Sequence, residues 1–519
     1  MQVDYVIVGG GSAGCVMAAR LSEDPAVSVL LLEAGGEARN PLLHLPAGLA
    51  EALGHKVADW DFATVPQPGL DNRRLRWPRG RVLGGSSGIN AMCYARGDLS
   101  DYDDWGQGWS GAEALHLFKA SETHSEGISQ WHGDSGPLRV TRPDWSHPAT
   151  RRYLEAGEQA GHARVEDFVA PVRDGVGRFD TTTHRGLRCS AARAYLPDAV
   201  RARPNLTIRT GQQVRRVGFD GHRAVAVETG SDTFEARCEV ILSAGAIGSP
   251  QLLMLSGIGP AADLAEHGIG LVHDAPGVGG NLQDHLDITC MLLTRPGSAI
   301  GYAPGTLGQA LRAPYDWLRG RTGLLASNLA EGNGFARSRE GLEKPDIQFH
   351  FLPALGENHG QTRNWGRTGV SLHACALYPR SRGRLRLASA DPAAKPVIDP
   401  NYLSDERDLA VLVAGARMAT TILSQPAFDD IRVGWHRPSD PPDTDAGWET
   451  EIRTRAESIY HPVGTAAMGD VTDGDGRVAG VGGLRVVDAS LMPTIVGGNT
   501  NAPVIMMAER IARRIAEAA

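Results

Sequence analysis

The sequence lacks the features of several familiar protein classes. None of its six cysteines, at 15, 93, 189, 238, 290 and 375, forms a C-x-x-C pair. This spacing argues against a zinc site and against a disulfide framework, so we predict no metal ligands and reduced, structural thiols. No apolar run approaches the ~20 residues of a membrane span. No secretory signal precedes the first predicted strand, which leaves the cytoplasm as the expected location.

The sequence also has no excess of positively charged residues. The formal net charge is −8 and the pI is about 6.1, which disfavours nucleic acid or an anionic membrane as the main partner. Peripheral contact with a membrane stays open. With 519 residues, of which 42% are hydrophobic and 22% charged, the chain has the composition of a globular protein with two or more domains. It contains no internal repeats and no low-complexity tracts.

Residues 4–33 have the pattern of a dinucleotide-binding βαβ unit. An apolar run, 4–8, leads into Gly9-x-Gly11-x-x-Gly14 and an alanine-rich helical stretch. Glycines at this spacing permit a tight turn, close approach to a pyrophosphate and packing of the helix on the strand. The phosphates would lie at the free amides of the helix N-terminus. A second strand, 27–32, ends at Glu33, where a carboxylate meets the adenosine ribose. A glycine triplet alone is also typical of an ordinary turn, but the full order favours the dinucleotide.

Two further glycine-rich segments follow. The irregular stretch 38–80 leads into Arg79–Tyr94, where dense small residues indicate that the backbone lies against something flat or anionic. A buried strand over 239–246 then precedes a helix over 249–259, with proline near its start and glycine at its end. Ordinary βα packing is the alternative for this second segment. Its return to the sheet of the dinucleotide domain fits better.

The pattern of apolar and polar residues changes in the later half of the chain. The stretches 346–351 and 370–378 alternate as half-buried antiparallel strands do, and 383–387 adds a third. Helices are predicted near 405–424 and 445–457, followed by a strand over 483–489 and a helix over 501–517. We predict an α/β fold with a Rossmann-like dinucleotide domain and a discontinuous substrate domain, an antiparallel sheet backed by helices. The predicted dinucleotide parts are 1–155, 191–290 and 456–519; the substrate parts are a substrate or cap excursion at 156–190 and the main segment 291–455.

Four segments together resemble the glucose–methanol–choline (GMC) oxidoreductases: the opening triplet with Glu33, Gly80–Tyr94, Gly245–Gly259 and Tyr460–Asn501. They occur in this order over nearly the whole chain. The resemblance implies FAD rather than NAD, and oxidation of an alcohol by hydride transfer to flavin N5. Within the family the chain resembles the bacterial alcohol and choline dehydrogenase branch, judged by Gly498–Pro503 and Pro379–Arg384.

The chemistry needs a base, because hydride leaves a carbinol carbon only as its hydroxyl proton is removed. The resemblance gives this role to His461, whose ordinary pKa near 6.5 suits neutral pH. The family's second position is Asn499, an amide that can hydrogen-bond and orient the substrate oxygen. Alternatively, Asn499 or Asn501 caps the last helix, and both roles can hold. The start of that helix would stabilise the negative charge of the reduced flavin ring.

The resemblance also implies a set of FAD contacts. The pyrophosphate contacts are Gly11, Ser12 and Gly14, with Gly9 and Ala13 beside them; the ribose contacts are Glu33 and Ala34; the isoalloxazine and ribityl contacts are Val82, Gly84, Gly85, Asn90, Ala91, Met92 and Cys93; the others are Val214 at the adenine, Ala244, Asp488, Ala489, Asn499, Thr500 and Asn501. Trp60 either covers the adenosine or is a core tryptophan. Because Ile89 stands where some members carry a flavin-linked histidine, we expect non-covalent FAD.

The substrate side is less well marked. Phe349, His350, Phe351 and Tyr460 are the candidate substrate residues, although ordinary sheet packing is the alternative for at least one of residues 349–351. Choline would require an aromatic cage and a carboxylate, for which Glu331 is the candidate, but the residues around it do not indicate a cage. We therefore favour a small primary or aliphatic alcohol.

Several alternatives stay open beside this one. Choline dehydrogenase is the first, and an FAD-containing lyase or photodecarboxylase of the same fold is the alternative from another class. The electron acceptor is a quinone-type molecule or oxygen, and we expect no nucleic-acid partner. The oligomeric state cannot be predicted from these residues.

Overall fold

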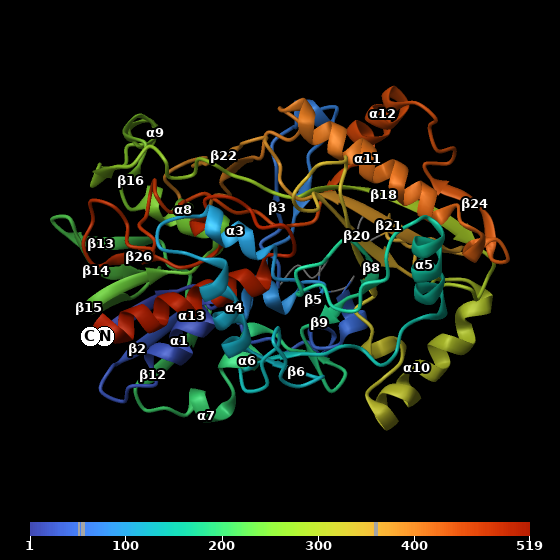
Figure 1. The fold of residues 1–519 in the computed structure, drawn as a ribbon. Coiled ribbons are helices and arrows are strands. Elements are labelled where there is room, and N and C mark those ends of the chain that lie inside the picture. Colours follow the sequence, from blue (N-terminus) through green and yellow to red (C-terminus); the bar gives the residue numbers. More distant parts are fainter. Residues whose placement is uncertain (50–51, 53–57, 358–361, 519) are drawn as a thin grey trace.

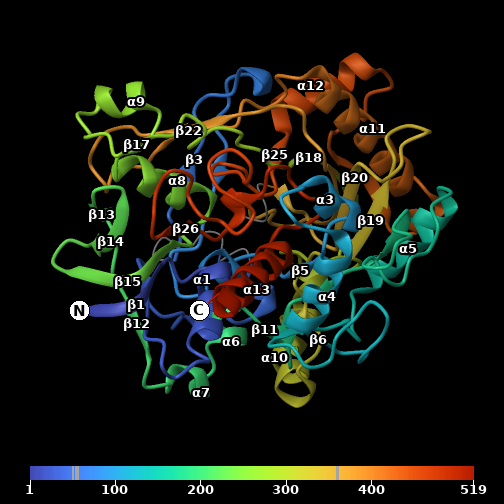
Figure 2. The ribbon, with the colours of Figure 1, turned by 60° about the vertical axis from the view of Figure 1, so that its left-hand side comes forward.

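The computed structural model describes residues 1–49, 52, 58–357 and 362–518, and its chain is built around two seven-stranded sheets (Figures 1 and 2). The first sheet consists, in spatial order, of β12 (Leu206–Thr210), β2 (Val29–Glu33), β1 (Gln2–Val8), β15 (Thr233–Leu242), β14 (Arg223–Glu228) and β13 (Arg216–Asp220), with β26 (Leu484–Val486) beside β15. The second consists of β24 (Arg432–Arg437), β18 (Leu286–Thr294), β21 (Thr368–Ala376), β20 (Ile347–Leu352), β19 (Gly332–Ala336) and β8 (Gly175–Arg178), with β25 (Glu457–Ser458) beside β18.

The first sheet is parallel through its centre, where β1 lies between β2 and β15. Continuous burial of β2 and of most of β1 explains their unbroken apolar sequences, since both faces of a parallel sheet are covered. The helices of this half are α1 (Ser12–Leu21), α6 (Ala191–Tyr195), α8 (Gly245–Leu255) and α13 (Asn501–Ala518). Helices α1 and α13 lie side by side although they come from opposite ends of the chain (Figure 1).

The second sheet is antiparallel throughout. Helices α5 (Pro148–Gln159) and α11 (Glu406–Leu423) cover one of its faces, with α12 (Asp445–Arg455) beside α11. The aromatic ring of Tyr153 on α5 stacks on Phe351 of β20, with 4.7 Å between the ring centroids. The helices therefore lie on the same face as Phe351, and the opposite face is free to line a cavity.

The remaining α-helices and strands of the described part of the chain lie outside the two large sheets. They are α3 (Leu99–Asp104), α4 (Gly111–Ser121), α7 (Asp198–Arg201), α9 (Ala261–Glu266), α10 (Leu307–Gly320), β3 (Phe62–Ala63), β4 (Arg76–Trp77), β5 (Cys93–Tyr94), β6 (Glu122–His124), β7 (Leu138–Val140), β9 (Asp180–Thr181), β10 (Thr183–His184), β11 (Leu187–Arg188), β16 (Ile258–Gly259), β17 (His273–Asp274), β22 (Arg384–Arg386) and β23 (Val397–Asp399).

The predicted fold class is confirmed, with one local correction. The strand expected over 383–387 forms as β22 but pairs with β23 in a separate two-stranded sheet instead of extending the large one. Its alternating pattern indicates a half-buried strand and carries no information about the partner strand. The division into domains stays a prediction. Among the described residues, every helix is too short or too polar to cross a membrane.

The close approach at the first turn can be tested with an alanine. A Cβ added at Gly14 would lie 1.9 Å from the carbonyl oxygen of Gly9, so Gly14→Ala must push α1 away from β1. We expect a loss of about 1–3 kcal/mol of unfolding free energy, measured by chemical denaturation. Gly36→Ala is the matched control, because a Cβ there meets nothing within 4 Å. Equal stability of the two variants would contradict the packing described here.

Candidate functional site

One cavity of about 380 Å³ lies between the two sheets. Its walls come from the turn after β1, the segment 78–93, the start of α8, and the two C-terminal stretches 459–462 and 488–501. Strands β20 and β21 of the second sheet add His350 and His373. The cavity thus joins the part with dinucleotide-binding features to the face of the antiparallel sheet that the helices leave uncovered.

The end of the cavity near β1 has the donors and the space that a dinucleotide needs. Gly11 precedes α1 without a side-chain cap, so the first amides of the helix are available to an anion. A Cβ at Gly85 would lie 2.7 Å from the Cα of Gly11, and only glycine permits the two backbones to approach this closely. Glu33 accepts hydrogen bonds from the amides of Gly10 (2.8 Å) and Gly35 (2.7 Å). Burial raises the pKa of Glu33 to about 7 despite these bonds. The donor set fits a pyrophosphate and a ribose.

Most of the predicted cofactor residues line this cavity. They are Gly9, Gly11, Ser12, Ala13, Glu33, Ala34, Trp60, Gly85, Asn90, Ala91, Met92, Cys93, Val214, Ala244, Asp488, Ala489, Asn499, Thr500 and Asn501, and Ile89 lies among them. The indole of Trp60 also stacks on Phe62, with 5.9 Å between ring centroids, and carries the guanidinium of Arg81 at 4.7 Å. Trp60 is therefore both a wall of the cavity and part of an aromatic cluster.

Three predicted cofactor residues lie behind the wall: Gly14, Val82 and Gly84 are not among the described residues that line the cavity. Gly14 faces the Gly9 carbonyl, and the Val82 side chain packs into a small apolar cluster with Leu43 and Ile89. Gly84 forms the turn, with φ of 103°, and its amide donates to the Gly10 carbonyl at 2.7 Å. These residues shape the backbone that the neighbouring positions present.

His461 belongs to the segment after β25 and lines the cavity. A hydrogen bond from its backbone fixes its position. Its amide donates to Oδ1 of the buried Asp284 at 2.7 Å. The other oxygen of Asp284 accepts hydrogen bonds from the hydroxyls of Ser458 and Tyr402. Burial raises the pKa of Asp284 to about 6, although these bonds favour its charged form. The carboxylate therefore ties the His461 segment to the start of β18.

The neighbouring His285 determines which nitrogen of His461 carries a proton. His285 Nε2 lies 2.8 Å from the carbonyl oxygen of Leu377, which can only accept, so Nε2 is protonated. Burial lowers the pKa of His285 to about 4, so the ring is neutral and its Nδ1 is an acceptor. His461 Nδ1 lies 3.0 Å from this Nδ1 and must donate to it. The neutral His461 ring thus keeps a lone pair on Nε2.

Asn499 lies beside that lone pair. Its Nδ2 is 3.4 Å from His461 Nε2, and its Oδ1 accepts from Gln348 Nε2 at 3.3 Å. The structure therefore brings together the two predicted catalytic residues. Burial, followed by the nearby His285, His350 and Arg79, lowers the pKa of His461 well below its usual range. The ordinary value near 6.5 therefore does not hold for His461 at this buried position, where the Arg79 guanidinium and two other imidazoles lie close by.

The substrate face corrects two predictions. Phe349 and Phe351 are fully buried beneath the helices and are not among the described residues that line the cavity, whereas Tyr460 lines it. Of residues 349–351, only the predicted His350 lines the cavity among the described residues, together with its alternating neighbour Leu352. Successive strand side chains point to opposite faces, so the apolar pattern identified the correct strand but the wrong face.

On the side of the second sheet, the carboxylate that lines the cavity is Asp287, not Glu331. Both oxygens of Glu331 are engaged: Oε1 by the Ser327 hydroxyl at 2.6 Å, Oε2 by the Thr150 hydroxyl at 2.5 Å and the His147 amide. Asp287 is fully buried, lines the cavity and pairs through Oδ2 with His373 Nδ1 at 2.5 Å. Its Oδ1 has no hydrogen-bond partner within the described part of the chain.

Sequence reasoning missed Arg79, Asp284, His285, Asp287 and His373 as members of this site. A signal for three of them was present, because Asp287 interrupts the apolar pattern of β18, and Asp284 and His285 directly precede it. Charged residues in such a run are costly to bury unless they have partners or a function. The partners come from segments far away in the sequence, and the local pattern does not identify them.

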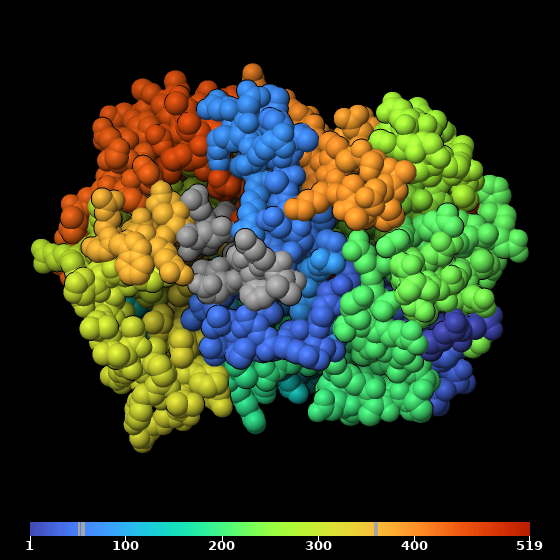
Figure 3. Space-filling model, turned by 180° about the vertical axis from the view of Figure 1, so that it is seen from behind, coloured from blue at the N-terminus to red at the C-terminus, as the bar shows by residue number. Residues whose placement is uncertain are grey.

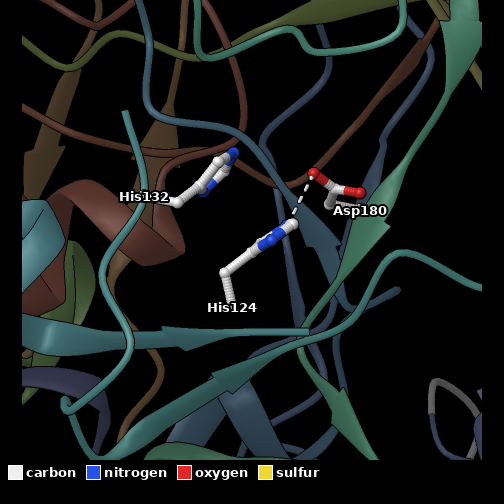
Figure 4. Close-up of side chains that lie close together, drawn as sticks. All are labelled: His124, His132 and Asp180. Atoms are coloured by element: carbon white, nitrogen blue, oxygen red, sulfur yellow. Dashed lines mark hydrogen bonds and ion pairs between the residues drawn. The ribbon is translucent and has the colours of Figure 1, made fainter. Parts of the chain in front are cut away.

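A second polar cluster lies away from the cavity. Figure 4 shows His124, His132 and Asp180 close together, an arrangement that could in principle hold a metal. His132, however, donates from both nitrogens, to Glu122 at 2.8 Å and Asp167 at 3.0 Å. Burial alone would lower its pKa, but these bonds to Asp167 and Glu122 raise it to about 9. A protonated imidazole has no lone pair for a metal, so this cluster is an ion-pair network.

Comparisons with known proteins agree with this geometry. The GMC oxidoreductase family matches residues 3–287 with its N-terminal part and 379–508 with its C-terminal part. The chain is 44% identical to the alcohol dehydrogenase [acceptor] of Pseudomonas putida (99% of this chain, 95% of the other) and 42% identical to an oxygen-dependent choline dehydrogenase of Brucella ovis (99% and 96%). The crystal structure of pyridoxine 4-oxidase from Mesorbium loti superposes with a TM-score of 0.90 at 34% identity, covering 99% of both chains. This chain belongs to the GMC oxidoreductase family.

Proposed function

We propose that this protein oxidises the CH–OH group of a small alcohol to the aldehyde, with His461 as the base. FAD is the cofactor, and it supplies the acceptor for the hydride when bound. The residues that would hold it are those at the first turn, Glu33, and the segments 85–93 and 488–501. The observation that supports the proposal most directly is the lone pair on His461 Nε2, which lies in the cavity with the Asn499 amide nitrogen 3.4 Å away.

The chain's own groups account for the movement of the proton. The hydroxyl of the alcohol donates to His461 Nε2, while the amide of Asn499 holds the same oxygen in position. The proton then resides on Nε2, and Nδ1 keeps its hydrogen bond to His285. Because the pKa of His461 is low, the neutral ring predominates at pH 7 and the basic form needs no prior deprotonation.

His461→Ala tests the base. We expect the rate of flavin reduction under anaerobic conditions to fall by about 10²–10⁴-fold, because proton removal then relies on water. Stopped-flow absorbance of the loaded enzyme with a primary alcohol measures this rate. His222→Ala, at an exposed position, is the control and should leave the rate unchanged. An unaltered rate in His461→Ala would remove the assignment.

A pair of His285 variants tests the role of the acceptor at His461 Nδ1. His285→Asn keeps an acceptor near that position, whereas His285→Leu has similar bulk and none; both lose the bond to Leu377. We expect the rate of flavin reduction to fall about 10–100-fold more in His285→Leu than in His285→Asn, because the base is no longer held in one tautomer. The readout includes ¹⁵N NMR of the His461 ring, which should show a protonated Nδ1 only in wild type and His285→Asn. Identical behaviour of the two variants would limit His285 to packing.

A cationic alcohol such as choline is the second candidate substrate, and Asp287 favours it. A buried carboxylate with an unused oxygen at the cavity wall is complementary to a cation or to a hydroxyl donor. Tyr460 is an aromatic residue that also lines this cavity. This arrangement supports polar or cationic alcohols more than the simple aliphatic alcohols favoured by the sequence pattern.

Asp287→Asn separates the two substrate classes. With choline, we expect kcat/KM to fall about 10–100-fold, because a charge-assisted contact is lost. With 3,3-dimethylbutan-1-ol, the uncharged analogue of the same shape, we expect little change. Steady-state kinetics on both alcohols, with dye and with oxygen as acceptor, gives the comparison. An equal loss on both would mean that Asp287 stabilises the fold of the site and does not select charge.

The remaining alternatives differ in what happens to the flavin. A lyase or photodecarboxylase would leave the flavin spectrum unchanged when an alcohol is added without oxygen, whereas the proposed reaction bleaches it. The electron acceptor is a quinone-type molecule or oxygen; the names of the relatives include both acceptor-dependent and oxygen-dependent enzymes. Reoxidation rates with a soluble quinone and with oxygen decide between these two.

A further inference from the structure

Helix α10 has its apolar side chains turned outward. Leu307, Leu311, Tyr315 and Leu318 are 60%, 72%, 57% and 70% exposed, and Ala313 is the one buried residue of this helix. Their spacing of four and seven residues places them along a single stripe of the helix. Figures 1 and 2 show α10 projecting from the body of the protein, and it lies at the lower left of the face in Figure 3. An apolar stripe exposed in this way indicates a binding surface.

Tyr302, shortly before this helix, forms an aromatic pair with Trp365 from the segment before β21. Tyr302 and Trp365 are 50% and 70% exposed, and their ring centroids are 5.0 Å apart. Exposed Trp and Tyr rings are typical of the boundary between water and lipid, where the ring is apolar and its polar atom stays hydrated.

The charges that surround the stripe are positive. Between 302 and 322 the sequence contains three arginines, Arg312, Arg319 and Arg321, and one acidic residue, Asp316. Arg312 pairs with Asp316 at 3.1 Å, but Arg319 donates to the Tyr315 hydroxyl at 2.8 Å, and Arg321 lies 3.8 Å above the Trp317 ring. The partners of Arg319 and Arg321 are neutral groups, so these contacts do not compensate the positive charge of either arginine.

The neighbouring hairpin adds to this positive charge. Trp317 Nε1 donates to the carbonyl of Gly186 at 2.9 Å, which joins α10 to the turn between β10 and β11. The exposed Arg139, Arg185 and Arg193 lie close enough to His184 of this hairpin to lower its pKa, after the larger effect of burial. The charge around α10 is therefore positive, although the net charge of the chain is −8. The net charge disfavours binding of the whole molecule to an anionic membrane, but it does not describe this part of the surface.

We propose that α10, with Tyr302 and Trp365, docks on the surface of an anionic lipid bilayer. The leucines and aromatic rings would enter the boundary between headgroups and acyl chains, with the arginines at the lipid phosphates. A second copy of this chain fits less well, because a symmetric contact through the stripe would bring the arginines of the two copies together. The helix lies on the membrane and does not span it.

Vesicle co-sedimentation of the FAD-loaded protein tests this surface. The probes are vesicles of phosphatidylglycerol with phosphatidylethanolamine, and vesicles of phosphatidylcholine alone. We expect binding to the anionic vesicles that weakens as salt rises, and much weaker binding to the neutral ones. Leu311→Asp should lower the bound fraction about 10-fold, whereas Leu271→Asp, at an isolated exposed leucine, should not. Arg319→Glu with Arg321→Glu should weaken both the binding to anionic vesicles and its salt dependence, with Arg151→Glu as the control.

Other results would overturn the proposal. These are no binding to anionic vesicles at low salt, or equal binding of Leu311→Asp and wild type. Light scattering supplies a further check: if Leu311→Asp changes a dimer into a monomer and leaves vesicle binding unaltered, the stripe is an interface between copies. The rate of alcohol oxidation in solution should stay unchanged in Leu311→Asp, which shows that the variant is folded.

Discussion

The candidate site depends on one buried carboxylate, Asp284. It precedes β18 and accepts hydrogen bonds from the backbone of His461 and from the hydroxyls of Ser458 and Tyr402. An unpaired carboxylate at this depth would be costly, so these three donors and the nearby Arg79 have to be present together. Their arrangement fixes the backbone of His461. The next residue, His285, then fixes the tautomer of its ring, so that two adjacent side chains set both the position and the protonation of one imidazole.

The C-terminal segment must also return to the first turn of the chain. Ser12 at the start of α1 donates to Asn501 Oδ1 at 2.7 Å, and farther along the same pair of helices Arg20 pairs with Glu509 at 2.8 Å. The fully buried Glu509 also accepts from the Tyr195 hydroxyl. Because this carboxylate has two donors on different segments, α13 can pack against α1 in only one register. That register places the residues before α13, including Asn499, at the edge of the cavity.

These contacts explain which features the sequence could predict. The glycine triplet, Glu33 and the parallel strands follow from local rules, because each residue type is dictated by its own turn or by burial on both faces. The resemblance supplied His461 and Asn499. Local patterns could not supply Asp284 or His285, since their partners lie up to 177 residues away. They also could not decide the face of β20: alternation is symmetric, and only the packing of Tyr153 on Phe351 shows which side holds the helices.

Glu331 illustrates how burial alone misleads about function. Its oxygens bind the hydroxyls of Ser327 and Thr150 and the His147 amide, and Ser327 in turn accepts from the amide of Leu329. Leu329 has φ of 66°, a conformation that side-chain-bearing residues rarely adopt, so this turn requires external support. Glu331 provides that support, and the adjacent Ala330 forms the cavity wall. Since its hydrogen-bonding capacity serves the turn, the proposed recognition of a cationic alcohol rests on Asp287, whose Oδ1 has no hydrogen-bond partner among the described residues.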